Sequence, residues 1–371
     1  MALELNLDDA VRYHYGKFPP SEIDYGKLIA QISKTAEAIG RYDQVIKSLK
    51  NSSIFLSPLR SQEAVISSRM EGTVSTMDEV FQYDANGDAS ETRSETIETA
   101  LYRHALNDAQ NAINDGQPFS PFLIRSIHSV LLSYGRGATK SPGMFKTEQN
   151  YLAGGYGRRD VRFIPIAPEN LDEGIGKLLD FINNSDMPPL LKIAISHVEF
   201  EALHPFKDGN GRIGRMLITL LLWHYGLISQ PHFYISAFFE DHREEYIDSM
   251  RDVSKSDDWT QWCLFFLKAA ESQAKQNLAT AERIQQLYED LKIESNTMLS
   301  SKWNGSVLDF IFTRPIFPGS LLAEEIGVTP STGARFIRIL VDNGILHVAK
   351  IPSGRRPGIY RFERLMEIVR V

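Results

Sequence analysis

Residues 204–215, HPFKDGNGRIGR, combine side-chain types that together could handle a phosphorylated ligand. The ordinary pKa of a histidine lies near neutrality, so His204 can accept a proton from an attacking hydroxyl. Asp208 offers a hard carboxylate oxygen, and one carboxylate together with phosphate oxygens commonly holds Mg²⁺. An apolar run, MLITLLLWHYG, follows directly and predicts a helix.

The predicted helix would direct its unpaired N–H groups and the positive end of its dipole at the glycine-rich turn. Gly209 and Gly211 allow the backbone to approach a ligand closely and to take a positive φ where needed, and Asn210 can orient an oxygen with its amide. Arg212 and Arg215 can add forked, charge-assisted hydrogen bonds to phosphate. The segment therefore predicts attack of a hydroxyl on a nucleotide phosphate. The Gly-Lys-Ser/Thr ending of a P-loop is missing, which disfavours that class of kinase or NTPase.

The composition is that of an ordinary globular protein, with 371 residues, 43% hydrophobic and 23% charged, and a net charge of −7. This length suggests two or three domains, and this charge gives no case for bulk attraction to nucleic acid or to a membrane. Cys263 is the only cysteine and lies in the apolar run WCLFFL, so we expect a buried core residue and a cytoplasmic location. The N-terminus lacks a signal-peptide pattern. Residues 216–228, the most apolar run, fall short of the roughly 18 residues that cross a membrane.

The hydrophobic pattern predicts a mainly α-helical chain in three regions. Residues 1–95 form an N-terminal helical region, and residues 96–275 form a longer, mostly helical block. Within that block, residues 147–166 change to short β-like runs around a glycine-rich turn, which predicts a β-hairpin. Residues 276–371 continue as a linker helix, three further helices and two strands, an order that indicates a winged helix-turn-helix.

HPFKDGNGRIGR resembles the signature of the Fic family, His-Pro-Phe-x-Asp/Glu-Gly-Asn-Gly-Arg-x-x-Arg, with every defined position filled. HVEFEALHPF and EDHREEYIDSM resemble the family's flanking helices. The resemblance covers roughly residues 50–270 and implies a helical Fic core with a small β flap. It also implies an enzyme that moves AMP from ATP to a Tyr, Ser or Thr hydroxyl of a target protein, which can be the chain itself.

The resemblance implies a role for each residue of the motif. His204 would be the general base, and Asp208 would hold Mg²⁺ between the α- and β-phosphates of the co-substrate ATP. The hairpin at residues 147–166 resembles the family's flap, which would clamp the target backbone by strand addition. The residues implied in binding ATP are the anion-hole residues Gly209, Asn210 and Gly211, and the phosphate-binding Arg212 and Arg215.

A second segment, SSRMEGT at residues 67–73, is by itself only a helix end with an acid. It resembles the family's inhibitory motif, Ser/Thr-x-x-x-Glu-Gly/Asn, with Ser67, Glu71 and Gly72 at the defined positions. The resemblance implies that Glu71 pairs with Arg215 in the place of the γ-phosphate and restrains the activity. Some family members use this glutamate to remove AMP from a protein, so the reverse reaction stays open as an alternative.

Two other functions compete with this interpretation. His197, Glu201 and His204 stand at i, i+4 and i+7 of a predicted helix and could bind Zn²⁺, although this leaves the glycine turn and both arginines unexplained. The C-terminal region could instead make the protein a DNA-binding regulator, or it could bind a protein partner or mediate a homodimer. The basic residues that could meet DNA there are Arg335, Arg338, Lys350, Arg355 and Arg356.

The sequence assigns no contact to a nucleotide base among the aromatic residues that follow the motif. Tyr246 or a neighbour could line a base pocket, but a place in the hydrophobic core is the simpler expectation.

Overall fold

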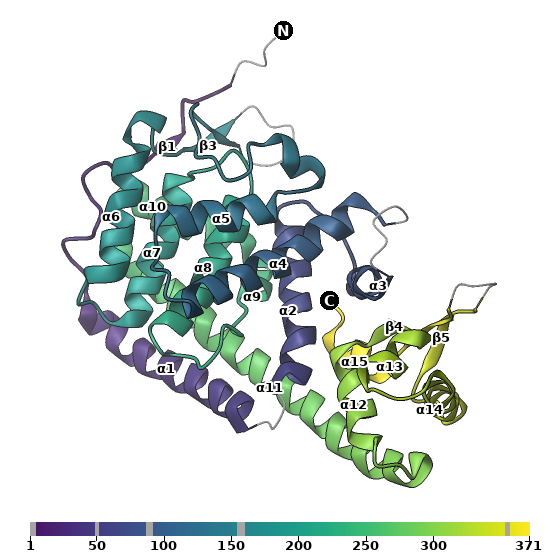
Figure 1. The fold of residues 1–371 in the computed structure, drawn as a ribbon. Helices are drawn as coiled ribbons and strands as arrows, with labels where there is room; N and C mark the ends of the chain where they lie inside the picture. The colour runs from purple at the N-terminus through teal and green to yellow at the C-terminus, as the bar shows by residue number, and fades with distance from the viewer. Residues whose placement is uncertain (1–4, 49–51, 87–91, 154–159, 353–356) are drawn as a thin grey trace. The chain divides into compact units, whose positions relative to one another are not determined.

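The computed structural model describes residues 5–48, 52–86, 92–153, 160–352 and 357–371. The chain is mainly α-helical with two small sheets, which confirms the predicted fold class (Figure 1). It forms two compact units, and each unit combines an early and a late stretch of the chain. The first contains residues 1–40 and 101–275, and the second contains residues 41–100 and 276–371. The three consecutive regions expected from the sequence stay a prediction about domain boundaries.

The first unit is built around two buried helices, α7 (Pro189–Leu203) and α8 (Asn210–His224). Residues 190–200 and 210–222 are buried throughout, as expected for helices that are surrounded by other elements. The other helices of this unit are α5 (Pro121–Leu131), η2 (Gly135–Thr139), η3 (Pro168–Asn170), α6 (Leu171–Asn184), α9 (Ser236–Asp241), α10 (Arg243–Ser256), most of α1 (Tyr25–Ser48), the later part of α4 (Ser94–Asn114) and the first part of α11 (Trp259–Leu299).

Cys263 on α11 lies in this core, as predicted. Its side chain is buried, and this burial raises the pKa of the thiol to about 12. Such a thiol stays protonated and unreactive at neutral pH. Within the described residues, no helix has the length and apolar character that a membrane span requires.

A small sheet with the order β1-β3-β2 lies in the first unit. Strand β2 (Leu152–Ala153) pairs antiparallel with β3 (Val161–Ile164), which confirms the two predicted strands of the hairpin. The glycine-rich turn between them, residues 154–159, lies outside the described residues. The other edge of β3 pairs in parallel with β1 (Val11–Arg12). The sequence did not predict β1, because two residues carry no detectable periodicity.

The second unit joins a helical segment near the N-terminus to the C-terminal part of the chain. Val65 of α2 and Phe81 of α3 share one hydrophobic core with Ile311 and Phe317. Asp78 of α3 also forms ion pairs with Arg361 and Arg370 of the C-terminal part. The helices of this unit, besides the ends of α1, α4 and α11, are α2 (Ser52–Met70), α3 (Met77–Asn86), α12 (Asn304–Thr313), α13 (Gly319–Glu325), α14 (Pro330–Asp342) and α15 (Glu363–Val369).

The C-terminal part contains the predicted helices and strands in the predicted order. The hydroxyl of Thr329 caps α14 by accepting a hydrogen bond from the backbone N–H of Thr332, at 3.3 Å. The sheet has the order β4-β6-β5, with β4 (Ile316–Pro318), β5 (His347–Lys350) and β6 (Ile359–Arg361). Strand β4 was not predicted. The expected basic turn with Arg355 and Arg356 lies outside the described residues.

Candidate functional site

The HPFKDG segment connects the buried helices α7 and α8 by a sharp turn. His204 ends α7 in a left-handed conformation, with φ 45° and ψ 60°, and its N–H donates to the carbonyl of Phe200 at 3.0 Å. This conformation is unfavourable for a residue with a β-carbon. His204 and Asp208 are both half-buried, so both can meet a ligand at the surface of the first unit. The structure thus places His204, the expected base, and Asp208, the expected metal ligand, on the same turn.

A strained histidine makes a testable prediction about stability. His204→Gly and His204→Ala both remove the imidazole, but only glycine adopts a positive φ without steric conflict. We expect the glycine variant to be more stable than the alanine variant by about 1 kcal/mol, measured by urea unfolding. Equal stability of the two variants, or a more stable alanine variant, would contradict the left-handed conformation of this residue.

Gly209 provides the backbone conformation that starts α8. It is the N-cap residue, with φ 81°, and Ile213 is the residue whose N–H donates back to the Gly209 carbonyl, at 3.1 Å. The N–H groups of Asn210, Gly211 and Arg212 belong to the first turn of a helix, where no intrahelical acceptor exists. These N–H groups have the position that the predicted anion site requires, and the site itself stays a prediction. Gly211 is part of the helix and has no positive φ, so only the first of the two glycines serves the turn.

The side chain of Asn210 closes the HPFKDG turn. Its Oδ1 accepts a hydrogen bond from the Phe206 N–H, and its Nδ2 donates to the Phe206 carbonyl, both at 2.9 Å. The amide nitrogen carries a second hydrogen, so the predicted contact to a phosphate oxygen stays a prediction. Asn210 also offers its backbone N–H at the start of α8.

Arg212 is the residue that most directly indicates an anion-binding function. Its side chain is 4% exposed, and its Nη2 donates to Asp208 Oδ1 at 3.3 Å. Its Nε and Nη1 are buried and have no hydrogen-bond partner in the described part of the chain. Buried donors without acceptors cost about 1–3 kcal/mol each, so they usually have an acceptor in the working state of a protein. Arg215, one helical turn further on, is also buried, with 2% of its surface exposed.

Asp208 has the chemistry that a phosphate-bound Mg²⁺ requires. Its side chain is 37% exposed, and its Oδ1 accepts a hydrogen bond from the Gly209 N–H at 2.6 Å in addition to that from Arg212. Among the described residues, no group of three or more His, Cys, Asp or Glu side chains is placed to hold a metal ion. A single carboxylate suits Mg²⁺, which is often held mainly by substrate phosphates, and not a cage of protein ligands.

His128 of α5 positions the motif from one side. Its ring stacks on Phe206, with centroids 3.7 Å apart and planes at 6°. Its Nδ1 accepts from the Gly143 N–H at 2.7 Å, and its Nε2 lies 3.0 Å from the carbonyl of Asp208. Burial lowers the pKa of His128 to about 4, so the ring is neutral and Nε2 carries the proton donated to Asp208. No sequence pattern indicated this contact.

Lys146 and Asn150, at the base of the flap, hold the same segment from another side. Lys146 donates from its N–H to the Pro205 carbonyl at 2.8 Å and from Nζ to the Leu203 carbonyl at 3.0 Å. Asn150 Nδ2 donates to the carbonyls of His204 and Phe206, both at 3.1 Å. Every carbonyl from Leu203 to Phe206 thus accepts a hydrogen bond from residues 146–150. The flap and the strained turn of His204 are one connected structure.

The buried amino group of Lys146 predicts a pH dependence of stability. Burial lowers its pKa to about 7, well below its ordinary value. Between about pH 7 and the pKa of this lysine in the unfolded chain, the unfolded chain binds more protons than the folded chain. Lys146 therefore makes the free energy of unfolding rise with pH in this range. We expect Lys146→Met to reduce the gain in unfolding free energy between about pH 7 and 10. The measurement is urea unfolding of both proteins at several pH values, and parallel curves for the two would contradict the shift.

His197 and Tyr246 belong to the core and not to a zinc or nucleotide-base site. His197 Nδ1 lies 3.1 Å from the Gly214 carbonyl, and its Nε2 lies 2.7 Å from the Tyr246 hydroxyl. Both ring nitrogens are therefore occupied, and burial lowers the pKa of His197 to about 3. Tyr246 is 3% exposed, in agreement with the core interpretation. The zinc alternative that needed His197 loses its first ligand.

A buried carboxylate on α7 anchors the strand β1. Glu199 accepts a hydrogen bond from the Tyr13 hydroxyl at 2.7 Å, and its other oxygen lies 2.8 Å from His14 Nε2. Ser254 completes this network, 2.7 Å from His14 Nδ1. Burial and the nearby Glu199 charge raise the pKa of Tyr13. This network fixes the N-terminal segment to the helix that carries His204, and no sequence motif indicated it.

Comparisons with known proteins agree with the motif and the fold. The family model for the Fic/DOC family N-terminal region matches residues 29–111, and the model for the Fic/DOC family matches residues 118–222. Together they cover about half of the chain, and the second match includes the whole HPFKDGNGRIGR segment.

Two curated relatives match the chain over limited segments. The protein adenylyltransferase fic-1 of Caenorhabditis briggsae is 33% identical over 87 residues, which are 23% of this chain and 16% of the relative. The probable protein adenylyltransferase aq_aa38 of Aquifex aeolicus is 32% identical over 107 residues, 27% of this chain and 31% of the relative. The chain spans less than a third of the length of these relatives.

Solved structures share the fold at low sequence identity. A Fic family protein from Desulfovibrio desulfuricans G20 superposes with a TM-score of 0.59 and 19% identity, covering 93% of this chain and 98% of that one. Fic-1 from C. elegans superposes with a TM-score of 0.51 and 19% identity, covering 69% and 75%. With the complete motif, both family matches and this fold, the chain belongs to the Fic/DOC family.

Proposed function

We propose that the protein is an adenylyltransferase that moves AMP from ATP to a hydroxyl group of a target protein. The observation that carries this proposal is the buried Arg212 guanidinium, with Nε and Nη1 unpartnered in the described part of the chain, at the N-terminus of α8. An anionic ligand would supply the missing acceptors. His204 lies at the same turn, and the curated relatives named above are called protein adenylyltransferases.

The chain's own residues would each contribute to one transfer step. His204 accepts the proton of the target hydroxyl while that oxygen attacks the innermost phosphorus of ATP. The bond from this phosphorus to the bridging oxygen breaks, and pyrophosphate leaves with the bonding electrons. The N–H groups at the start of α8, with Arg212 and Arg215, stabilise the charge on the phosphates. Mg²⁺, held by Asp208, would neutralise phosphate charge when bound.

The sheet of the first unit suggests how the target would be held. Strand β3 has β1 on one side and β2 on the other, so within the described residues β1 and β2 are the edge strands, and β2 is the one that belongs to the hairpin. A target backbone can add to such an edge as a further strand. Because Lys146 and Asn150 tie the start of this hairpin to the His204 turn, the added strand would be placed with respect to the base.

We also propose that Glu71 restrains the transfer by pairing with Arg215. Glu71 directly follows α2, in a turn closed by hydrogen bonds from the N–H groups of Gly72 and Thr73 to the carbonyls of Arg69 and Ser68, at 2.9 and 3.0 Å. The positive φ of Gly72, 80°, explains why glycine follows the acid. A carboxylate at a helix C-terminus is disfavoured by about 0.3–1 kcal/mol through the helix dipole. An acid at this unfavourable position supports a functional role.

The C-terminal part would hold this inhibitory segment, because α2 and α3 belong to the same unit. The Ser57 hydroxyl of α2 donates to the Thr313 carbonyl of α12 at 3.1 Å. The order of helices and strands after residue 300 supports a winged helix-turn-helix. We propose that this C-terminal part holds the segment with Glu71 in its inhibitory position.

The experiment that tests the proposed function is a transfer assay with labelled ATP. We expect the protein, incubated with Mg²⁺, ATP labelled in the adenosine part and a bacterial lysate, to place label on protein side chains, itself included. Mass spectrometry identifies the modified hydroxyl. Label from γ-phosphate-labelled ATP on protein, without adenosine label, would instead show phosphate transfer. Loss of AMP from a modified protein without any addition would favour the reverse reaction.

A further inference from the structure

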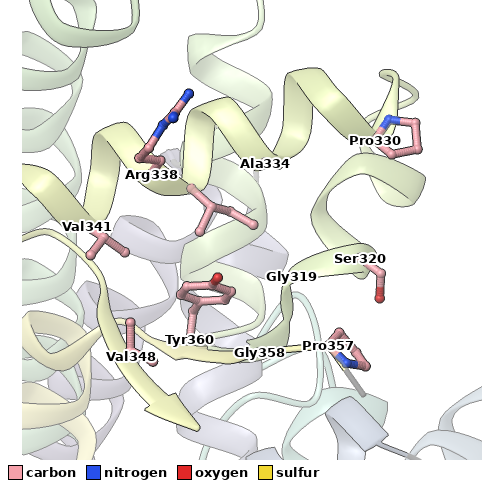
Figure 2. Close-up of a pocket in the computed structure, with 11 residues that line it drawn as sticks. Gly319, Ser320, Pro330, Ala334, Arg338, Val341, Val348, Pro357, Gly358 and Tyr360 are labelled. Atoms are coloured by element: carbon pink, nitrogen blue, oxygen red, sulfur yellow. The ribbon is translucent and has the colours of Figure 1, made fainter. Parts of the chain in front are cut away.

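The second unit contains an open apolar groove that the proposed transfer reaction does not use. It has a volume of about 410 Å³ and lies between α14 and the strands β5 and β6. Figure 2 shows Val341 of α14 on one side, with Val348 and Tyr360 on the strands opposite it. Gly319 keeps the groove open, since a β-carbon there would lie 2.8 Å from the Tyr360 ring. A groove of this size suits a few apolar side chains.

The groove lies beside an unprotected sheet edge. Strand β5 pairs with β6 on one side and, within the described residues, has no strand on the other. All its residues are exposed, including Val348 with 47% of its surface accessible. Ile351, just after the strand, is 77% exposed. Such an edge with apolar side chains favours the addition of an extended segment.

The charge around the groove favours an acidic partner. Arg335, Arg338 and Lys350 are exposed, and no carboxylate in the described part of the chain forms an ion pair with them. The other arginines that the structure describes after residue 300 have carboxylate partners: Arg314, Arg361, Arg364 and Arg370. Figure 2 shows the Arg338 side chain at the rim, directed away from Tyr360. A carboxylate at the rim would meet this charge without entering the apolar groove.

The chain itself contains a segment with the complementary pattern. Residues 2–9, ALELNLDD, alternate leucines with polar and acidic residues. Leu5 and Leu7 are among the exposed large hydrophobic residues, at 43% and 36%, and Asp8 and Asp9 are also exposed. Leucines two positions apart lie on the same face of an extended chain, about 6–7 Å from each other. In the structure Asn6 between them is held by its own unit, since the Val161 N–H donates to the Asn6 carbonyl at 2.9 Å and Asn6 Nδ2 donates to Asp160 Oδ1 at 3.1 Å. The side chains of both leucines stay exposed and can enter the groove of a second copy together, with the carboxylates following at its rim.

We infer that the groove between α14 and the β5–β6 strands binds the N-terminal segment, residues 5–9, of a second copy of the chain. Leu5 and Leu7 lie in the groove beside Val348, and the acidic residues that follow meet Arg338 and its basic neighbours. Nucleic acid is less favoured, because Arg338 is the only charged residue among the described residues that line the groove. This inference does not depend on the proposed transfer activity.

The first experiment measures binding of a fluorescent peptide, residues 2–10, to the full-length protein by anisotropy. We expect saturable binding that weakens with salt, because charges contribute. Val348→Asp and Arg338→Glu should each weaken it by about tenfold or more. Ile293→Asp is the matched control, since Ile293 is an exposed apolar residue of the same unit outside the groove, and it should bind normally. A peptide with both leucines replaced by aspartate should not bind.

The second experiment uses complementary variants of the full chain. One variant carries Leu5→Asp and Leu7→Asp, and the other carries Val348→Asp. We expect each to remain monomeric in light scattering, and their mixture to form a complex, because the mixture retains one intact segment and one intact groove. The inference is overturned if the wild-type chain neither binds the peptide nor associates. It is equally overturned if short duplex DNA, and not the peptide, binds in an Arg338-dependent manner.

Discussion

Replacing His204 with alanine is expected to lower AMP transfer by about 10²–10⁴-fold, because the target hydroxyl loses its proton acceptor. The variant should still bind ATP, since the N–H groups of α8 and both arginines remain in place. The measurement is the initial rate of labelled AMP incorporation at saturating ATP, with nucleotide affinity measured separately. The transfer rate should fall, while the affinity for ATP stays within a few-fold of the wild-type value.

The matched control for this variant is His347→Ala, which removes an exposed histidine of β5 in the second unit. It should transfer AMP at the wild-type rate. Two results would reject His204 as the base: transfer that persists in His204→Ala, or a loss of ATP binding equal to the loss of rate. The second result would show that the imidazole holds the nucleotide and does not accept the proton.

Replacing Glu71 with glycine is expected to raise AMP transfer by on the order of 10², provided that its carboxylate misplaces the ATP phosphates. A carboxylate about 4 Å from a phosphate charge repels it by roughly 4 kcal/mol at an effective dielectric near 20. Removing it would let the outermost phosphate reach Arg215. The rate of labelled AMP incorporation, compared between wild type and variant, measures the effect.

Glu71→Gln separates the charge of this residue from its size. We expect it to be activated as well, but less than Glu71→Gly, because the amide can still donate to or accept from groups near the phosphate position. Glu324→Gln, an exposed acid of α13, is the control and should leave the rate unchanged. Wild-type rates in both Glu71 variants would remove the restraint from the proposed function. Activation by Gly alone would assign the restraint to shape and not to charge.

The motif could be predicted because all its functional residues lie close together in the sequence. His204, Asp208, Gly209 and the two arginines lie within residues 204–215, and the start of α8 follows from the apolar run after them. Glycine adopts a positive φ without steric cost, so a glycine in a turn, such as Gly209, indicates that the backbone needs this conformation. The buried cysteine and the two strands of the flap were predicted for similar reasons, since a local run of residues carried each signal.

The supports of the motif could not be predicted, because their partners are far apart in sequence. His128, Lys146 and Asn150 bind the HPFKDG turn across more than fifty residues, and β1, near the N-terminus, pairs with β3 in the middle of the chain. The Asn210 amide is another example. Its residue type suggests phosphate binding, and only the tertiary structure shows that it also bonds the Phe206 backbone.

The functional groups of the site, the helical class of the chain and its family could all be predicted from the sequence, since they depend on residue types and short-range periodicity. Tertiary structure alone decided that His204 takes a left-handed conformation, that two donors of Arg212 are buried without acceptors, and that α2 shares its core with the C-terminal part. The physical reason is that burial and hydrogen-bond satisfaction depend on segments distant along the chain, which no local pattern brings together.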